Sequence, residues 1–307
     1  VVHSRGYGYA NLEKETPITP ASTFRLASVS KQFTAMAIAI LADRGQLDYS
    51  DLIGQYVPVL STYEGVTIRH LLTHTSGLPD YYDEFDASEW TERGMLPANI
   101  DVMTYEGSMD GPLFPPGEKY VYSNPAYEAL PLVVEAVSGQ DFATFMRDRL
   151  FRPSGMSGSL IHDHKRPQIE RRVLGYSEES GVYTLYDDDP LNGVVGSGGQ
   201  YSTLEDFYHW NRVLENEGLV STQTWKEILT RARLNDGEAI DYGFGWRLDS
   251  YKGHDRMAHG GSWVGFRTAI TRYPEAGLTI VILSNRAEYD PVVVSDQLAD
   301  IYLGEMP

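Results

Sequence analysis

Hydrophobic residues at helical spacing are clearest between Val29 and Arg44, near the start of the chain. On a helix with 3.6 residues per turn, one face would collect Phe33, Met36, Ala37, Ile40 and Leu41. Gly45 follows at the position where a helix commonly ends in a left-handed residue. The pattern therefore predicts an apolar helix over residues 29–44.

Apolar periodicity and capping signals predict further helices along the chain. They are expected at residues 66–75, 126–137, 140–151, 207–216, 222–233 and 291–302. Ser202 or Thr203 would cap the helix at 207–216, and Pro131 predicts a kink or a displaced start in the helix at 126–137. Residues 80–117 have weak patterning, and we interpret them as helices and loops that wall a cleft.

Short β-branched and aromatic runs near the C-terminal end predict strands instead. Four such runs, separated by Gly and Pro, are expected to form an antiparallel meander at residues 243–248, 254–259, 263–273 and 278–285. Residues 1–10 are also predicted to form a strand and a turn. The sheet is therefore expected to be built from both ends of the chain.

The predicted fold class is mixed α/β (α+β), with an antiparallel β-sheet flanked by helices and an inserted all-helical domain. The sheet domain would comprise residues 1–30 and 200–307, and the mostly helical domain residues 31–199. The cleft between the two domains is the expected place of an active site.

Composition narrows the classes of partner. The 307-residue chain has 25 basic and 43 acidic residues and a formal net charge of −18, which argues against nucleic acid or an anionic membrane as the main partner. The lack of cysteine excludes disulfides, a thiolate nucleophile and a zinc–thiolate site. No apolar run approaches the length of a membrane span. Because the first residue is Val1 rather than Met, we interpret the chain as a mature or trimmed form.

Ser28 and Lys31 form a Ser-x-x-Lys motif at the start of the first predicted helix. A serine at or beside the N-cap has its hydroxyl near unpaired N–H groups and the positive end of the helix dipole. Lys31 lies one turn further on the same face, and partial burial would lower its pKa so that it could accept the serine proton. The alternative is an N-cap serine followed by a solvated lysine.

Two later motifs offer partners for this pair. Tyr122 and Asn124 precede a predicted helix; a phenol among cationic groups can exist partly as phenolate and relay a proton, and an asparagine can donate to a substrate carbonyl. Alternatively, this is an aromatic turn in which Asn124 caps the helix.

The second of these motifs comprises His259, Gly260, Gly261 and Ser262, between two predicted strands. Its glycines allow a substrate to approach a strand edge, and the Ser262 N–H could join that of Ser28 as an oxyanion hole. It could equally be a Gly-rich hairpin.

Metal-binding patterns are weak in this sequence. His162 and His164 flank an aspartate, but the sequence places no third ligand near them. His70 and His74 lack the glutamate of a metalloprotease motif, so a structural role is expected for them. No metal site and no cofactor are predicted.

In their order and context, the three motifs resemble those of the serine β-lactamase and penicillin-binding-protein superfamily. The Tyr-x-Asn form is similar to that of class C β-lactamase-like proteins, which include D-alanyl-D-alanine carboxypeptidases, D-aminopeptidases and esterases. The segments LLTHTSGLP, FPPGEKYVYSN and HGGSWVGFRT also resemble this group. The resemblance covers nearly the whole chain, implies a β-lactamase/transpeptidase-like fold, and favours the periplasm or the outside of the cell.

Carried over to this sequence, the resemblance makes Ser28 the acylated nucleophile and Lys31 its proton acceptor. Tyr122 would be the general base and acid for the leaving group and the deacylating water, and Asn124 would hold the substrate amide. His259 would take the place of the third motif's basic residue. The usual residue there is lysine, and because a histidine is cationic only near or below its pKa, carboxylate binding would weaken at alkaline pH.

The function expected from the resemblance is hydrolysis through an acyl-enzyme, on a small molecule or peptide with an amide or ester bond, with D-amino-acid peptides as the leading substrates. An esterase on short-chain esters and a non-hydrolytic penicillin-recognising protein are the alternatives. Gly260 replaces the hydroxyl residue that is usual at this position of the third motif. Members of the family also usually carry a strand before the one that starts at Val1; if that strand is absent, the sheet is expected to have an exposed edge.

Overall fold

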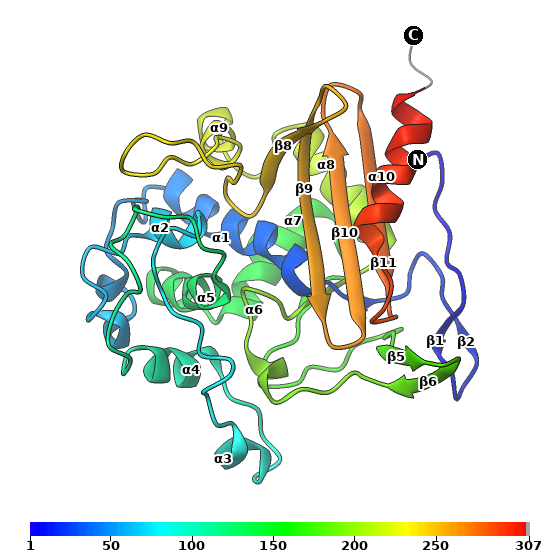
Figure 1. Ribbon diagram of the computed structural model, residues 1–307, viewed down its shortest axis with the longest axis horizontal. Helices are drawn as coiled ribbons and strands as arrows, with labels where there is room; N and C mark the ends of the chain where they lie inside the picture. Colours follow the sequence, from blue (N-terminus) through cyan, green and yellow to red (C-terminus); the bar gives the residue numbers. More distant parts are fainter. Residues whose placement is uncertain (305–307) are drawn as a thin grey trace.

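The computed structural model describes residues 1–304, and its largest sheet has four antiparallel strands (Figure 1). These are β8 (Arg247–Tyr251), β9 (His254–Trp263), β10 (Phe266–Tyr273) and β11 (Leu278–Ser284). Their spatial order is β11–β10–β9–β8, so each strand pairs with its neighbour in the sequence. The predicted meander is confirmed, although its first strand begins at Arg247 rather than at residue 243.

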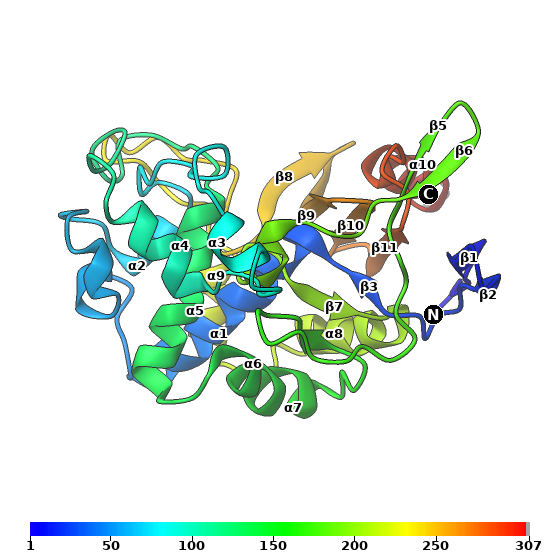
Figure 2. The same cartoon turned by 90° about the horizontal axis from the view of Figure 1, so that it is seen from below.

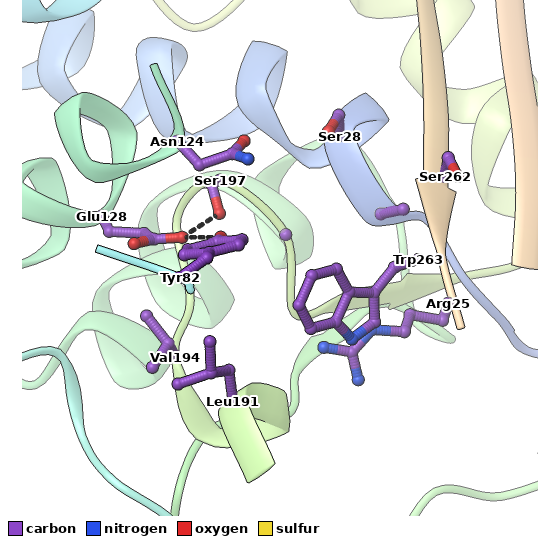
Figure 3. Close-up of a pocket in the computed structure, with 12 residues that line it drawn as sticks. Arg25, Ser28, Tyr82, Asn124, Glu128, Leu191, Val194, Ser197, Ser262 and Trp263 are labelled. Atoms are coloured by element: carbon purple, nitrogen blue, oxygen red, sulfur yellow. Dashed lines mark hydrogen bonds between the residues drawn. The ribbon is translucent and has the colours of Figure 1, made fainter. Parts of the chain in front are cut away.

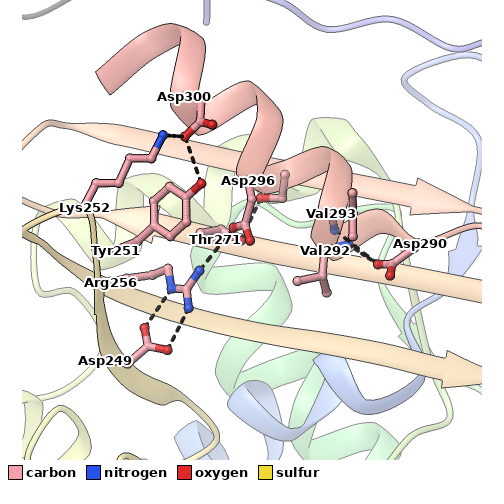
Figure 4. A network of polar contacts seen from close by, with 11 residues as sticks. Asp249, Tyr251, Lys252, Arg256, Thr271, Asp290, Val292, Val293, Asp296 and Asp300 are labelled. Atoms are coloured by element: carbon pink, nitrogen blue, oxygen red, sulfur yellow. Dashed lines mark hydrogen bonds and ion pairs between the residues drawn. The ribbon is translucent and has the colours of Figure 1, made fainter. Parts of the chain in front are cut away.

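Helices cover both faces of this sheet (Figures 1 and 2). One face packs against α10 (Pro291–Leu303), and α8 (Leu204–Glu215), capped by Thr203, lies on the other. Arg256 on β9 joins three elements: its guanidinium donates to Asp249 on β8 at 2.7 and 2.8 Å and to Asp296 on α10 at 3.1 Å (Figure 4). Because these groups are only partly exposed, the network fixes α10 on the sheet more firmly than an isolated surface pair would.

The helical part of the molecule is organised around α1 (Lys31–Asp43) and α5 (Asn124–Ser138), which pack together. The remaining helices are α2 (Ile68–Leu72), α3 (Ser88–Thr91), α4 (Asn99–Glu106), α6 (Phe142–Phe145), α7 (Arg152–Ser154) and α9 (Thr222–Ile228). Short 3-10 helices form η1 (Ala27–Ser30), η2 (Ile53–Gln55), η3 (Pro58–Leu60) and η5 (Pro190–Gly193), and a π-helix forms η4 (Met146–Phe151). Every residue from Lys31 to Leu41 is buried, so α1 is a core helix.

Helix α5 runs through Pro131 as a single element and begins two residues before its predicted start. A proline in a helix cannot bond the carbonyl four residues earlier, here that of Tyr127. Gly196 packs at this place: a Cβ there would lie 2.3 Å from the Tyr127 oxygen and 2.7 Å from Pro131 Cγ. Its φ of +103° also requires glycine. The loop that carries Ser197 is thereby held against α5.

The remaining strands are short. They are β1 (Tyr9–Asn11), β2 (Thr16–Pro17), β3 (Phe24–Arg25), β4 (Leu160–Ile161), β5 (Tyr176–Glu179), β6 (Val182–Leu185) and β7 (Gln200–Ser202). They form two hairpins, β1–β2 and β5–β6, and a three-stranded sheet in the order β3–β7–β4.

One expectation about the sheet is corrected by these strands. The N-terminal segment adds no strand to the main sheet: β1 pairs with β2, and residues 1–5 are exposed. Residues 31–199 contain the short strands β4, β5 and β6 beside their helices. The division into domains at residues 30 and 200 stays a prediction.

Within residues 1–304, no helix has both the length and the hydropathy needed to cross a membrane.

Candidate active site

Ser28 lies in η1, the turn that leads from β3 into α1, and its side chain is half-buried. Ala27 before it has a φ of +48°, a left-handed conformation that costs an alanine about 1 kcal/mol. The N-cap of α1 is Ser30, because η1 adds a helical turn ahead of α1. The expectation that Ser28 sits at or beside this cap is therefore corrected: it lies within the preceding turn.

Lys31 is fully buried, and its Nζ contacts three oxygens. It lies 3.3 Å from Ser28 Oγ, 2.8 Å from Asn124 Oδ1 and 3.0 Å from the Ser197 carbonyl oxygen. Burial lowers the pKa of Lys31 to about 7, against the opposing attraction of the Glu128 carboxylate. The alternative of a solvated lysine is therefore excluded.

The three contacts match the hydrogen-bonding capacity of a neutral amine. Such an amine has two N–H donors and one lone pair. If Asn124 and the Ser197 carbonyl accept the two N–H bonds, the lone pair faces the Ser28 hydroxyl. The arrangement can therefore take a proton from Ser28.

Glu128 is a site residue that the sequence analysis missed. One of its oxygens accepts from Tyr82 Oη at 2.5 Å and from Ser197 Oγ at 2.6 Å, and the other accepts from Tyr81 Oη at 2.6 Å. Burial raises the pKa of Glu128, and the three hydroxyls and Lys31 oppose this. The available signal was its position four residues after Asn124, which puts both on one face of α5.

Asn124 is the first residue of α5, and the helix cap is Ser123, whose hydroxyl accepts from Ala126 N at 3.2 Å. The alternative role of Asn124 as a cap is thus excluded. Because its Oδ1 accepts from Lys31, its amide nitrogen stays available for a further acceptor.

Tyr122 covers Lys31, whose Nζ lies 4.8 Å from the centre of the tyrosine ring. Burial raises the pKa of the Tyr122 phenol, although the Ser28 side chain has the opposite effect. The expectation of a partial phenolate is corrected: the phenol is protonated at neutral pH. The physical reason is the loss of water around the phenol, which disfavours the charged phenolate.

His259 is a neutral neighbour of Tyr122. It is buried, its Nδ1 lies 2.7 Å from the Gly260 oxygen and its Nε2 lies 3.0 Å from Tyr242 Oη. Burial, followed by the charge of Lys31, lowers the pKa of His259 to about 3. His74, whose ring centre lies 4.3 Å from that of Tyr122, has its pKa lowered for the same reasons. The expectation that His259 supplies a cation is corrected, since its imidazole is neutral across the physiological range.

Gly261 and Ser262 lie inside β9, so the Gly-rich motif is part of a strand rather than a hairpin turn. A Cβ on Gly261 would lie 2.4 Å from the Leu26 oxygen and 3.1 Å from the Ser28 nitrogen. Thr268 on β10 fastens the same segment by donating to the Leu26 oxygen at 2.7 Å. Strand β9 therefore approaches the Ser28 amide closely only because residue 261 is glycine.

A pocket opens beside Ser28 (Figure 3). Its lining residues come from β3, η1, α5, η5, β9 and two loops: Arg25, Ala27, Ser28, Tyr82, Asn124, Glu128, Leu191, Val194, Ser197, Gly198, Ser262 and Trp263. Tyr82 belongs to the stretch that was expected to wall a cleft. Lys31, Tyr122 and His259 are not among the lining residues. Within residues 1–304, no group of three or more His, Asp or Glu side chains could hold a metal ion.

Comparisons with known proteins agree with this fold. The β-lactamase family model matches residues 1–303, and the chain therefore belongs to the β-lactamase family. Its relatives include penicillin-binding protein 4* of Bacillus subtilis, 34% identical over 94% of this chain and 66% of that protein. A D-aminopeptidase of Gluconobacter oxydans is 27% identical over 97% of this chain and 56% of the enzyme.

Among solved structures, the octameric penicillin-binding protein homologue from Pyrococcus abyssi matches with a TM-score of 0.86 and 26% identity, over 99% of this chain and 71% of that one. The predicted mixed α/β, β-lactamase-like fold class is confirmed. The chain spans 66% and 56% of the length of the two curated relatives named above.

Proposed function

We propose that this chain is a serine hydrolase that forms an acyl-enzyme on Ser28 and acts on D-amino-acid peptides or amides. The observation that carries the proposal is the 3.3 Å contact between Ser28 Oγ and the buried Nζ of Lys31. The names of the relatives, penicillin-binding protein and D-aminopeptidase, support this substrate class.

The proposed first step is attack of Ser28 Oγ on the substrate carbonyl. The oxygen forms a bond to the carbonyl carbon as its proton passes to the Lys31 lone pair. The N–H groups of Ser28 and Ser262 stabilise the resulting oxyanion, and the Asn124 amide nitrogen holds the substrate amide.

In the second step the leaving group departs with a proton from the Tyr122 phenol, which recovers one from the Lys31 ammonium. A water molecule then attacks the acyl carbonyl carbon while Tyr122 relays its proton to the Lys31 amine. The bond from that carbon to Ser28 Oγ breaks, Ser28 Oγ takes up a proton from Lys31, and the acid product leaves.

Esterase activity is a second candidate, favoured by the neutral His259. A family member with a cation at this position can bind a substrate carboxylate. The uncharged imidazole of His259 does not favour such substrates over those that lack a carboxylate. Amides and esters whose leaving group has no carboxylate are therefore acceptable substrates in both versions.

The test of the proposal is intact mass after incubation with a fluorescent penicillin, a D-alanyl-D-alanine thioester and p-nitrophenyl butyrate. An adduct that maps to Ser28, with turnover of the thioester, supports the peptidase. Turnover of the butyrate alone selects the esterase. A stable penicillin adduct without turnover of any substrate selects the non-hydrolytic binding protein, and no adduct at all refutes acyl-enzyme formation.

We expect Gly261→Ala to lower kcat/KM about 10²- to 10³-fold, the cost of losing one oxyanion donor. The new methyl group would collide with the Leu26 oxygen and push β9 away from the Ser28 amide. The matched control is Gly260→Ala, whose Cβ would meet its nearest atom, Val292 Cγ2, at 3.6 Å. Equal effects of the two substitutions on kcat/KM would contradict the assigned geometry.

The pH profile of kcat/KM is expected to have an acidic limb near pH 7. Below the pKa of Lys31, about 7, the amine is protonated and cannot accept the Ser28 proton, so the rate falls about tenfold per pH unit. Glu128 favours the ammonium, so Glu128→Gln should move the limb to lower pH. Glu106→Gln is the control, because burial raises the pKa of Glu106 to about 8 and the carboxyl is already mostly neutral at pH 7. A limb that stays in place in Glu128→Gln would contradict the role of Lys31 as the base.

A further inference from the structure

Arg25 is a buried cation without a counter-charge. Its side chain is 3% exposed, and among residues 1–304 its guanidinium makes neither an ion pair nor a hydrogen bond. A buried charge is costly unless it is paired, and arginine stays protonated at any physiological pH. The side chain therefore has unused binding capacity for an anion.

The neighbours of Arg25 do not supply that anion. The Tyr201 ring is close to two guanidinium groups, with its centre 5.7 Å from Arg25 Cζ and 5.8 Å from Arg172 Cζ. Arg172 is paired with Asp187 at 2.6 Å, so that carboxylate is already used. Burial, followed by the charge of Arg25, lowers the pKa of His162 to about 4, so this neighbour is neutral.

Arg25 also lines the pocket that opens beside Ser28. Figure 3 shows its guanidinium beneath the Trp263 indole, on the side away from Ser28. The indole is fixed by its Nε1, which donates to Asn192 Oδ1 at 2.8 Å, and Leu191 and Val194 add apolar surface. The pocket thus leads from the nucleophile, past an apolar wall, to a cation.

Glu128 does not neutralise this cation. It lines another wall of the pocket, where Tyr82 and Ser197 donate to one carboxylate oxygen and Tyr81 to the other. Its carboxylate also acts on Lys31, because its charge opposes the lowering of the lysine pKa. The pocket therefore has separate positive and negative walls.

We propose that the pocket takes the acyl part of the substrate and that Arg25 binds a carboxylate at the end of that acyl group. The guanidinium offers a planar pair of N–H donors that matches a carboxylate. Assignment to the acyl part rests on the proposed function, because Tyr122, which serves the leaving group, is not among the lining residues. The anion site itself rests only on Arg25 and its surroundings.

The test compares two amides that differ in one terminal group, N-glutaryl-D-alaninamide, which ends in a carboxylate, and N-pentanoyl-D-alaninamide, which ends in a methyl group. Binding is measured by calorimetry to Ser28→Ala, which cannot be acylated. We expect the glutaryl compound to bind about 10- to 100-fold more tightly, as a charged hydrogen bond implies. Equal binding of the two probes, or binding of neither, overturns the proposal.

Variants in the same Ser28→Ala background locate the effect. Arg25→Gln should bring the ratio of the two affinities to about one, and Arg25→Lys should keep part of it, because the charge remains. Arg272→Gln is the control: Arg272 is a buried arginine on β10, outside the pocket, that donates to Asn211. The ratio is insensitive to a uniform loss of folded protein, and a ratio unchanged by Arg25→Gln overturns the proposal.

The proposed function and the anion site are tested by different measurements, so either can fail without the other. Labelling of the wild-type protein by fluorescent penicillin or a thioester reports acylation of Ser28, whereas the calorimetric ratio reports the anion site. A protein that is never acylated but still prefers the glutaryl compound would refute the hydrolase and retain the site.

Discussion

Replacing Ser28 by alanine is expected to lower kcat about 10⁴- to 10⁶-fold and to abolish the covalent adduct, because no other group can form the acyl-enzyme. The Ser28 hydroxyl has the Lys31 amine within 3.3 Å, so its removal eliminates both the nucleophile and the proton transfer. Intact mass after incubation with fluorescent penicillin and single-turnover hydrolysis of a D-alanyl thioester measure the two effects.

Ser30→Ala is the matched control for this substitution. Ser30 lies two residues further in the same helical segment, and its hydroxyl is buried and makes no hydrogen bond with residues 1–304. The loss of an unpaired buried hydroxyl should leave acylation nearly unchanged. A covalent adduct on Ser28→Ala would show that another residue is the nucleophile.

Lys31→Met should lower the rate of acylation about 10²- to 10⁴-fold, the usual contribution of a positioned base. Methionine keeps the length and apolar surface of the stem but cannot accept a proton. The remaining rate should lose the acidic limb near pH 7, because the group that titrates there is gone. The rate of adduct formation as a function of pH measures both changes.

This substitution also affects stability, and a double variant separates the two effects. Below the pKa of Lys31, about 7, the lysine is the counter-charge of the buried Glu128, and its loss in Lys31→Met should lower the free energy of unfolding at such pH by about 3 kcal/mol. Lys31→Met with Glu128→Gln should recover much of that stability without recovering the acylation rate. Recovery of the rate together with the stability would contradict a direct role for the lysine.

Local patterns predicted the elements that hold the site, because their signals lie within a few residues of one another. The apolar stripe of α1, the cap at Thr203 and the strands of the meander follow from periodicity and turn residues. The same patterns misplaced the N-terminal segment, since a strand-like composition does not say whether a sheet edge is free to pair.

The protonation states could not be read from the sequence. Tyr122 was expected to be partly ionised and His259 to be cationic, but the structure buries His259 and half-buries Tyr122, and the loss of water disfavours the charged form of each. How deeply a side chain is buried depends on packing between segments that are far apart in the chain. Here His74, Tyr122, Tyr242 and His259 come from four such segments.

By itself, the sequence determined that Ser28 and Lys31 lie one helical turn apart. It also determined that this motif and the two after it stand in the order found in the β-lactamase family. Those features are local, because spacing along one helix or one loop fixes them. Only the tertiary structure decided that Lys31 is buried beside Glu128 and that Arg25 faces the pocket unpaired, because desolvation and charge pairing arise only when distant segments pack together.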